Sequence, residues 1–242
     1  MSVPKVPKKD VQRLDKFLSA QLGITRSEAK ELIKRRVVTV GGAVAKLFDM
    51  KIDPEKDTVC SEGKEVTYRK HIYIMMNKPQ GVVCSTKDGE SKTVLELLPD
   101  SIRREGLFPA GRLDKDTEGF VFITDDGVLA HNILSPKHHV DKTYFAKLET
   151  PATEDDIKAF EEGLAIDGGD VCLPAKLEIL TDPHEVLITI REGMYHQIKR
   201  MAQARNNKVL YLKRISIGGV KLDENLALGE WREMLHKETE NI

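Results

Sequence analysis

The chain has 242 residues, 40% hydrophobic and 32% charged, which is enough to bury a core and excludes disorder as its main state. Aromatic residues make up only 5%, which excludes a broad surface for stacking many bases. The net charge of −1 hides an asymmetry, since residues 1–51 carry 12 Lys and Arg against 5 Asp and Glu, whereas the rest carry 26 against 34. A basic first part on an acidic body indicates a polyanionic partner, although a solvated basic helix without a partner explains the charge equally well.

The first domain is predicted at residues 1–60, with residues 1–10 as a basic, proline-containing tail that we expect to be mobile. Apolar residues recur at helical spacing at Leu14, Phe17, Leu18 and Leu22. Thr25 and Glu28 form a capping-box pattern, so a second helix is predicted to begin at Arg26. Strands at residues 37–40 and 43–47, joined by a Gly-Gly turn, are typical of a hairpin.

The second helix and the residues after it carry a basic ridge, for which we favour contacts with RNA phosphates over simple solvation. The ridge consists of Arg26, Lys30, Lys34, Arg35 and Arg36. Two short helices, a hairpin and these cations resemble the S4 RNA-binding module, and residues 13–18, 26–27 and 37–42 carry the likeness. At Arg13 and Asp15 the pattern leaves open whether the side chains contact RNA or simply hold the two helices together.

Residues 61–70 have no apolar period and include a glycine, so they are predicted to be a linker to a second domain at residues 71–242. In that domain the patterns predict strands at 72–76, 82–85, 119–124, 143–149, 177–180, 185–191 and 208–217. They predict helices at 94–98, 128–134, 154–162 and 196–204. Several links between strands are too short for crossover helices, which favours an α+β fold with a mixed, largely antiparallel sheet.

Four segments of the second domain carry the residues suited to chemistry. They are 77–81 (Asn-Lys-Pro-Gln-Gly), 111–114 (Gly-Arg-Leu-Asp) with Thr117 and Gly119, 142–144 (Lys-Thr-Tyr), and 192–201. In this order they resemble the catalytic domain of the RsuA/RluA-type pseudouridine synthases. Residues 77–86, 135–139 and 217–219 place the resemblance nearest to the branch that acts on small-subunit ribosomal RNA, and it covers nearly the whole chain.

The resemblance implies that a uridine of 16S ribosomal RNA, at position 516, is converted to pseudouridine without cofactor or metal. The reaction moves ribose C1′ from base N1 to base C5. A single ionised carboxylate serves either by attacking C1′ or by removing the C2′ proton. Asp114 matches the catalytic aspartate of the family, and the two mechanisms stay open.

Three further residues match positions at or near the family's active site. A partly buried aspartate needs a cation beside it to stay ionised, and Lys199 is the candidate, although it also reads as a surface cation on a helix. Tyr144 is expected to stack the extruded base, although core packing is the usual role of a strand tyrosine. Arg112 is expected to contact the flanking RNA backbone or fill the place of the displaced base; a loop-shaping salt bridge is nearly as favoured.

Other charged residues near these motifs received simpler interpretations. Lys142 is predicted to bind RNA beside Tyr144. Asp116 and Glu118 are interpreted as solvated loop charges, and His196 as structural. The three cysteines show no metal or disulfide spacing, and no glycine-rich phosphate loop is present, so neither a metal nor a nucleotide cofactor is expected.

The predicted protein is a cytoplasmic monomer with no membrane segment, whose partner is 16S ribosomal RNA or a small-subunit assembly intermediate. Three alternatives remain. The chain could modify a different site in 23S ribosomal RNA, it could be a non-catalytic S4-type RNA-binding protein, or it could hydrolyse a glycosidic bond. The hydrolase would need a second working carboxylate near Asp114.

Overall fold

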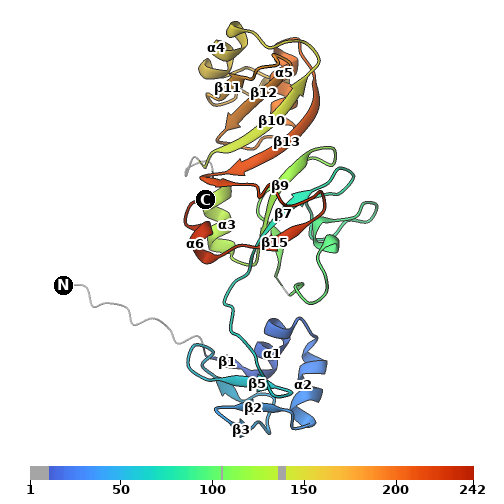
Figure 1. The fold of residues 1–242 in the computed structure, drawn as a ribbon, viewed down its shortest axis with the longest axis vertical. Coiled ribbons are helices and arrows are strands. Elements are labelled where there is room, and N and C mark those ends of the chain that lie inside the picture. Colours follow the sequence, from blue (N-terminus) through green and yellow to red (C-terminus); the bar gives the residue numbers. More distant parts are fainter. Residues whose placement is uncertain (1–10, 105, 136–139) are drawn as a thin grey trace, which may run out of the picture. The chain divides into compact units, whose positions relative to one another are not determined.

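The computed structural model describes residues 11–104, 106–135 and 140–242 (Figure 1). The tail at residues 1–10 and the motif residues 136–139 lie outside the described residues. The chain divides into two units, which are treated separately: residues 1–70 with 98–106, and residues 71–97 with 107–242.

The N-terminal unit contains two helices and small antiparallel strands. Its elements are β1 (Gln12–Arg13), α1 (Leu14–Leu22), α2 (Arg26–Lys34), β2 (Val38–Val40), β3 (Ala43–Val44), β4 (Lys51–Ile52), β5 (Val59–Ser61) and β6 (Lys64–Glu65). The predicted capping box is present, because the Glu28 backbone N–H donates to Thr25 and the Thr25 N–H donates to the Glu28 carboxylate at 2.7 Å. The core of the unit includes Leu14, Phe17 and Ile33, which lie on the apolar sides of both helices.

The structure corrects three details of the sequence predictions in this unit. Residues 12–13 pair with β4 before the first helix begins, and the strand expected at 43–47 is limited to β3. Residues 61–65, expected in the linker, belong to a hairpin in which Cys60 pairs with Glu65. Strands of two or three residues are too short to show a period of two, so no pattern in the sequence predicts them.

The second unit is built on one mixed sheet. Its strands are β7 (Tyr73–Lys78), β8 (Phe108–Pro109), β9 (Glu118–Thr124), β10 (Lys142–Leu148), β11 (Lys176–Ile179), β12 (Glu185–Ile190), β13 (Val209–Ile217), β14 (Val220–Lys221) and β15 (Trp231–Glu233). The order across the sheet is β11-β12-β10-β13-β9-β7-β15, with β14 beside β13 and β8 beside β9. Of the paired strands described, only β9 and β13 run parallel, so the predicted mixed, largely antiparallel α+β fold is confirmed.

Helices lie against both ends of this sheet. They are η1 (Val94–Leu97), α3 (Gly127–Leu134), α4 (Glu154–Glu162), η3 (Asp167–Gly169), α5 (Gln197–Ala204) and α6 (His236–Thr239). Helix α4 packs on β11 and α5 packs on β13 (Figure 1). The strand expected at 82–85 is reduced to a single bridge between Val83 and Thr93, and residues 98–106, expected in the second domain, group with the first unit. There Arg104 donates to the carbonyl oxygens of Arg69 and Lys70.

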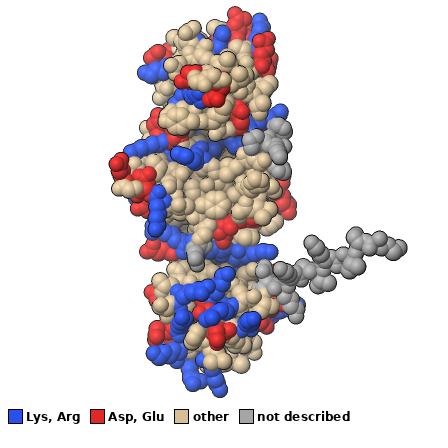
Figure 2. All heavy atoms as spheres, turned by 180° about the vertical axis from the view of Figure 1, so that it is seen from behind, with Lys and Arg blue, Asp and Glu red and all other residues tan. Residues whose placement is uncertain are grey.

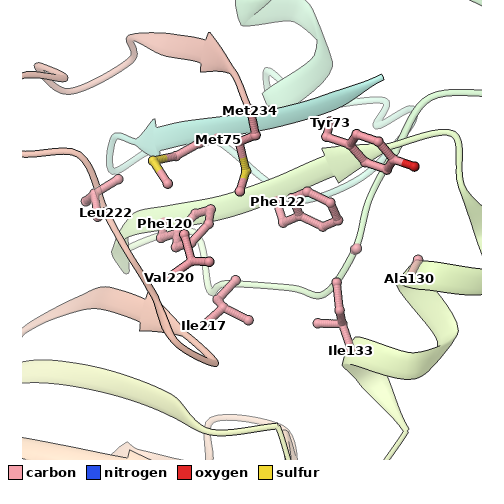
Figure 3. Packing of buried hydrophobic residues seen from close by; sticks show 11 residues of the cluster. Tyr73, Met75, Phe120, Phe122, Ala130, Ile133, Ile217, Val220, Leu222 and Met234 are labelled. Carbon is pink, nitrogen blue, oxygen red and sulfur yellow. The ribbon is translucent and has the colours of Figure 1, made fainter. Parts of the chain in front are cut away.

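One apolar core cluster of the second unit lies between the sheet and α3 (Figure 3). Phe120 and Phe122 on β9 and Met75 on β7 are fully buried there. Ile133 on α3 faces these side chains in Figure 3, so burial of apolar area holds the helix on the sheet. This packing fixes β9, the strand that follows the Gly-Arg-Leu-Asp segment.

Gly119 allows β9 to approach β13 more closely than a larger residue could. Its φ is +102°, and a Cβ there would lie against the carbonyl oxygen of Arg214 and 2.8 Å from the Arg214 nitrogen. Because backbone cannot move as a side chain can, the glycine is required by both its conformation and its neighbour. The close contact sets the position of the loop that precedes β9.

We therefore expect Gly119→Ala to lower the free energy of unfolding by at least about 3 kcal/mol, since strain and overlap add. Denaturant unfolding checks this against Gly127→Ala. Gly127 begins α3 with open space around its Cα, so its substitution should be neutral or slightly stabilising. Equal stabilities for the two variants would contradict the role assigned to Gly119.

Candidate active site

Asp114 lies in the loop between β8 and β9, in the second unit. The loop begins at Gly111, whose φ of +104° suits glycine, and Leu113 anchors it by burial. The Leu113 N–H donates to Cys84 Sγ at 3.4 Å, and the Thr117 N–H donates to the Asp114 carbonyl oxygen at 3.1 Å. The aspartate is thus held on a turn whose main chain is fixed on both sides.

Lys78, at the end of β7, holds this turn from beneath. Its side chain is fully buried, and the ammonium donates to the carbonyl oxygens of Pro79, Asp114 and Thr117 at 3.0, 3.0 and 2.7 Å. Burial lowers the pKa of Lys78. The motif pointed to Lys78, but only the structure shows that its ammonium binds the main chain of the aspartate loop.

The Asp114 carboxylate is paired with a cation, as predicted from the sequence. Lys199 Nζ on α5 lies 2.9 Å from Asp114 Oδ2, and His196 Nε2 lies 3.6 Å from Asp114 Oδ1. About a quarter of each side chain of the Asp114–Lys199 pair is exposed, so the pair is shielded yet open to a substrate. Such a position suits a carboxylate that must stay ionised in a pocket.

Lys199 also binds Asp116, which the sequence analysis interpreted as a solvated charge. Lys199 Nζ lies 2.6 Å from Asp116 Oδ1, so one ammonium bridges two carboxylates. Partial burial acts to lower the pKa of Lys199, but hydrogen bonds to Asp116 and Asp114 outweigh it, so the pKa lies above its ordinary value. Burial likewise acts to raise the pKa of Asp116, but Lys199 outweighs it and the net pKa is lowered.

The interpretation of Glu118 as a solvated loop charge is wrong. Glu118 is 9% exposed, and its carboxylate accepts a hydrogen bond from the Tyr211 hydroxyl at 2.6 Å. Burial and this hydrogen bond raise the pKa of Tyr211. Glu118 is the first residue of β9, and Tyr211 lies on β13. The hydrogen bond between their side chains therefore fixes β9 on β13.

A pocket of about 700 Å³ opens beside Asp114, within the range of about 300–1,000 Å³ for small-molecule sites. Its walls come from the aspartate loop, β10, the segment 83–88 and the start of α5. The lining includes Arg112, Asp114, Tyr144, Tyr195, His196 and Lys199. The sequence-predicted residues Asp114, Lys199, Tyr144 and Arg112 are therefore brought to one cavity from three separate segments.

Arg214 on β13 is a residue that the sequence analysis missed. It pairs with Tyr144 across the strands, its Nε donates to the Phe120 carbonyl oxygen at 2.7 Å, and its Nη1 lies 3.5 Å from the Tyr144 hydroxyl. The side chain is 2% exposed, and among the described residues its Nη2 has no hydrogen-bond partner. It holds Tyr144 at the pocket wall, and no local motif marks an arginine inside an otherwise ordinary strand.

The structure disagrees with the RNA contact expected for Lys142. This side chain is 7% exposed, and its ammonium donates to the Val140 carbonyl oxygen at 3.0 Å. Burial, together with the nearby charge of Arg214, lowers the pKa of Lys142 to about 8. A buried ammonium that is already bound to the main chain does not reach a phosphate.

The basic ridge of the N-terminal unit is exposed, and Figure 2 shows Lys and Arg spread over that unit. Arg26, Lys30 and Lys34 lie on α2, and Lys30 Nζ lies 5.0 Å from the centre of the Phe48 ring. Arg13 and Asp15 form a two-pronged ion pair at 3.0 and 2.9 Å, and this pair lowers the pKa of Asp15. Asp15 is thus buried and structural, while the ridge is available to a polyanion.

Within the residues that the structure describes, no helix is long and apolar enough to cross a membrane. Over the same residues, no cluster of three or more His, Cys, Asp or Glu side chains is arranged to hold a metal ion.

Known proteins share this architecture. The family described as RNA pseudouridylate synthase matches residues 72–204, and the S4 domain matches residues 12–58. The chain is 48% identical over 229 residues to YtzG of Bacillus subtilis, an uncharacterized RNA pseudouridine synthase, covering 93% of this chain and 96% of the relative. It is 46% identical over 233 residues to the ribosomal small subunit pseudouridine synthase A of Vibrio cholerae, covering 95% and 99%.

A solved structure also matches this chain over nearly its whole length. A crystal structure of a pseudouridylate synthase, 42% identical in sequence, matches over 95% of this chain and 99% of that chain with a TM-score of 0.67. The ribosomal small subunit pseudouridine synthase A of Escherichia coli K12 is likewise 42% identical over 231 residues, covering 95% of this chain and 99% of the relative.

The buried ammonium of Lys142 has a consequence for stability. Between about pH 8 and 10.5 the folded chain has lost the Lys142 proton that the unfolded chain still binds, so unfolding takes up a proton and stability rises with pH. Relative to Lys142→Met, which keeps the apolar stem and removes the charge, the free energy of unfolding of the wild type should rise across this window. Urea unfolding at several pH values measures it; a constant difference between the two proteins would contradict the assignment.

Proposed function

The chain belongs to the RNA pseudouridylate synthase family, and we propose that it converts one uridine of 16S ribosomal RNA, at position 516, to pseudouridine. The relatives from Vibrio cholerae and Escherichia coli that are named for the ribosomal small subunit support this choice of RNA. A ribosomal RNA substrate supports a cytoplasmic location as part of this proposal. We propose that it acts as a monomer, because Asp114, Lys199 and Tyr144 converge on one pocket within a single chain.

The observation that carries the proposal is the convergence of Asp114, Lys199 and Tyr144 on one pocket. The carboxylate and the ammonium are 2.9 Å apart, and the tyrosine ring is held by Arg214 on the same wall. A glycosyl rearrangement on an unstacked uridine needs three groups: an ionised carboxylate, a cation that keeps it ionised, and an aromatic ring on which the base can stack.

In the proposed reaction, the target uridine leaves its stack and its base lies against Tyr144. Asp114 then either attacks C1′ or removes the C2′ proton, and the bond from C1′ to N1 breaks. The base turns and its C5 joins C1′, which either displaces the Asp114 carboxylate from C1′ or is accompanied by return of the proton from Asp114 to C2′. The C5 proton then passes to solvent, and N1 gains a proton. Uridine and pseudouridine are isomers, so the scheme calls for no oxidant and no external energy source.

Lys199 contributes by keeping Asp114 negative while the RNA excludes water from the pocket. A lysine provides a point charge rather than the planar fork of arginine, and here it divides its hydrogen bonds between Asp114 and Asp116. Arg112, at the edge of the same pocket, is proposed to contact the RNA backbone next to the target. The ridge on α2 is proposed to bind RNA phosphates and to supply most of the affinity.

Asp116 is the observation that favours the hydrolase alternative, because it is a second carboxylate paired with Lys199 beside Asp114. It is 68% exposed, however, and its partner Lys199 lowers its pKa, which opposes a role as a proton donor. A hydrolase would release free uracil, whereas an isomerase releases only the C5 proton. The product therefore separates the two activities.

We expect the protein to release tritium from C5-tritiated 16S ribosomal RNA and to release little from 23S RNA. Asp114→Asn should reduce the rate at least about 10³-fold, because the amide carries no charge and is neither nucleophile nor base. RNA binding by the variant, measured by filter retention, should stay close to that of the wild type.

The matched control is Asp116→Asn, which removes the other carboxylate from Lys199. It should keep most of the activity, since the exposed Asp116 only shares the ammonium. Loss of activity in Asp116→Asn alone would move the catalytic role to that residue. Uracil as product would support the hydrolase, and neither tritium release nor uracil would support a binding protein.

Neutralising the ridge tests the role of the N-terminal unit. Simultaneous substitution of Arg26, Lys30 and Lys34 by Ala should weaken RNA binding. It should also reduce the magnitude of the negative slope of the log association constant against log salt concentration by about 2 to 3, since each phosphate contact contributes about 0.7 to 0.9. As a control, Ala at Lys158 and Lys176, exposed lysines of the second unit already paired with acids, should leave the slope unchanged.

A further inference from the structure

Tyr195 is an exposed aromatic side chain at the candidate active site. Among the described Phe, Tyr and Trp residues, only Phe48 and Tyr195 are exposed, and Phe48 belongs to the other unit. Tyr195 is 74% exposed and also lines the pocket that contains Asp114. A single exposed apolar residue is ordinary on a protein surface, but an exposed aromatic ring at a binding pocket indicates a ligand contact.

Among the described residues, the ring of Tyr195 has one aromatic stacking partner. It lies on the His196 imidazole with ring centres 3.8 Å apart and planes 18° apart. The residue is 74% exposed, so among the described residues the opposite face of the ring is accessible to a second flat group. His196 itself points toward the carboxylate, with Nε2 3.6 Å from Asp114 Oδ1, so the stack adjoins the proposed reacting centre.

The main chain holds this stack in place. His196 adopts a left-handed conformation, with φ of 49°, directly before α5. On one side, the Gln197 side chain accepts from the Met194 N–H at 3.1 Å and donates to Glu192 at 2.6 Å. On the other, Arg200 is bound to Asp167 and Asp170 and lies 3.4 Å from the Tyr195 carbonyl oxygen. An aromatic side chain on a backbone that is already held loses less entropy when it binds than one on a free loop.

The chemistry of the surroundings suits RNA. Arg112 and Lys115 line the same pocket, so cations are available to the phosphates of a strand that enters it. When a uridine is drawn out of its stack, its neighbours lose stacking on one face, and single-stranded RNA recovers such contacts on aromatic side chains. Tyr144 already provides a ring within the pocket for the target base under the proposed function.

We propose that Tyr195, backed by His196, forms a second base-binding subsite, which stacks the base of a nucleotide adjacent to the target uridine. This inference rests on the proposed function, since it takes the pocket to be the site of the target. The subsite accepts a base through its flat face and makes no hydrogen-bond readout, so it favours purines by area rather than by identity. It restores the stacking that extrusion of the uridine removes.

The test uses an RNA fragment on which the wild-type protein releases tritium, with 2-aminopurine in place of the nucleotide on the 5′ or the 3′ side of the target. Stacking quenches the fluorescence of 2-aminopurine. In one of the two positions, the bound reporter should be dimmer with the wild type than with Tyr195→Ala, and Tyr195→Ala should bind the RNA about tenfold or more weakly. Turnover at saturating RNA should fall less than affinity.

Two further variants separate the ring from other effects. Tyr195→Phe keeps the ring and should match the wild type in both affinity and fluorescence. Leu210→Ala removes an apolar side chain that is 59% exposed and absent from the pocket lining, and it should also match the wild type. Because Tyr195 is on the surface, its substitution leaves the core intact, and circular dichroism confirms folding.

The outcomes are distinct. Unchanged affinity and unchanged reporter fluorescence in Tyr195→Ala, with tritium release by the wild type intact, would overturn the subsite alone. A response to Tyr195→Ala in affinity but at neither reporter position would assign the ring to the target base or a phosphate and also overturn it. Absence of tritium release by the wild type on any ribosomal RNA would overturn the proposed function and the subsite together.

Discussion

The ion pair between Asp114 and Lys199 joins parts of the chain that are 85 residues apart. Asp114 lies on the loop that enters β9, and Lys199 lies on α5, which leads into β13. Since β9 and β13 are the parallel pair in the sheet, their starts lie at the same edge, and the loop and the helix meet there. The position of the ammonium beside the aspartate therefore depends on the register of two strands, and that register depends on the close contact of Gly119 with Arg214.

Arg214 connects this contact to the third component of the site. Its backbone lies against Gly119, its Nε binds the main chain of Phe120, and its Nη1 reaches the hydroxyl of Tyr144. Strand β13 thus stands between the strand of the aspartate loop and the strand of the tyrosine. Carboxylate, ammonium and aromatic ring are placed by three adjacent strands and one helix, which are more rigid supports than free loops.

Beneath the pocket lie three buried cations whose main partners are carbonyl oxygens rather than acids. Lys78 is fully buried, Lys142 is 7% exposed and Arg214 is 2% exposed, and each donates to the main chain. A carbonyl oxygen satisfies a donor without cancelling its charge. The second unit is acidic by composition, yet these three buried cations contact the aspartate loop, β9 and β10, next to the place where a polyanion and an ionised aspartate are proposed to meet.

From the sequence alone, the fold class, the RNA-modifying family, the helix that begins at Arg26 and the candidates Asp114, Tyr144 and Lys199 could be predicted. Helix caps, apolar periods and short motifs involve residues that are close together in the sequence, so the sequence alone predicts them. Strands of two residues, the segment 98–106, the bridging role of Lys199 and the burial of Lys142 and Glu118 could not be predicted. Arg214 and the exposed ring of Tyr195 gave no local signal either. Each of these depends on which distant residue lies opposite, and only the packed sheet decides that, because partners across strands are set by register rather than by spacing in the sequence.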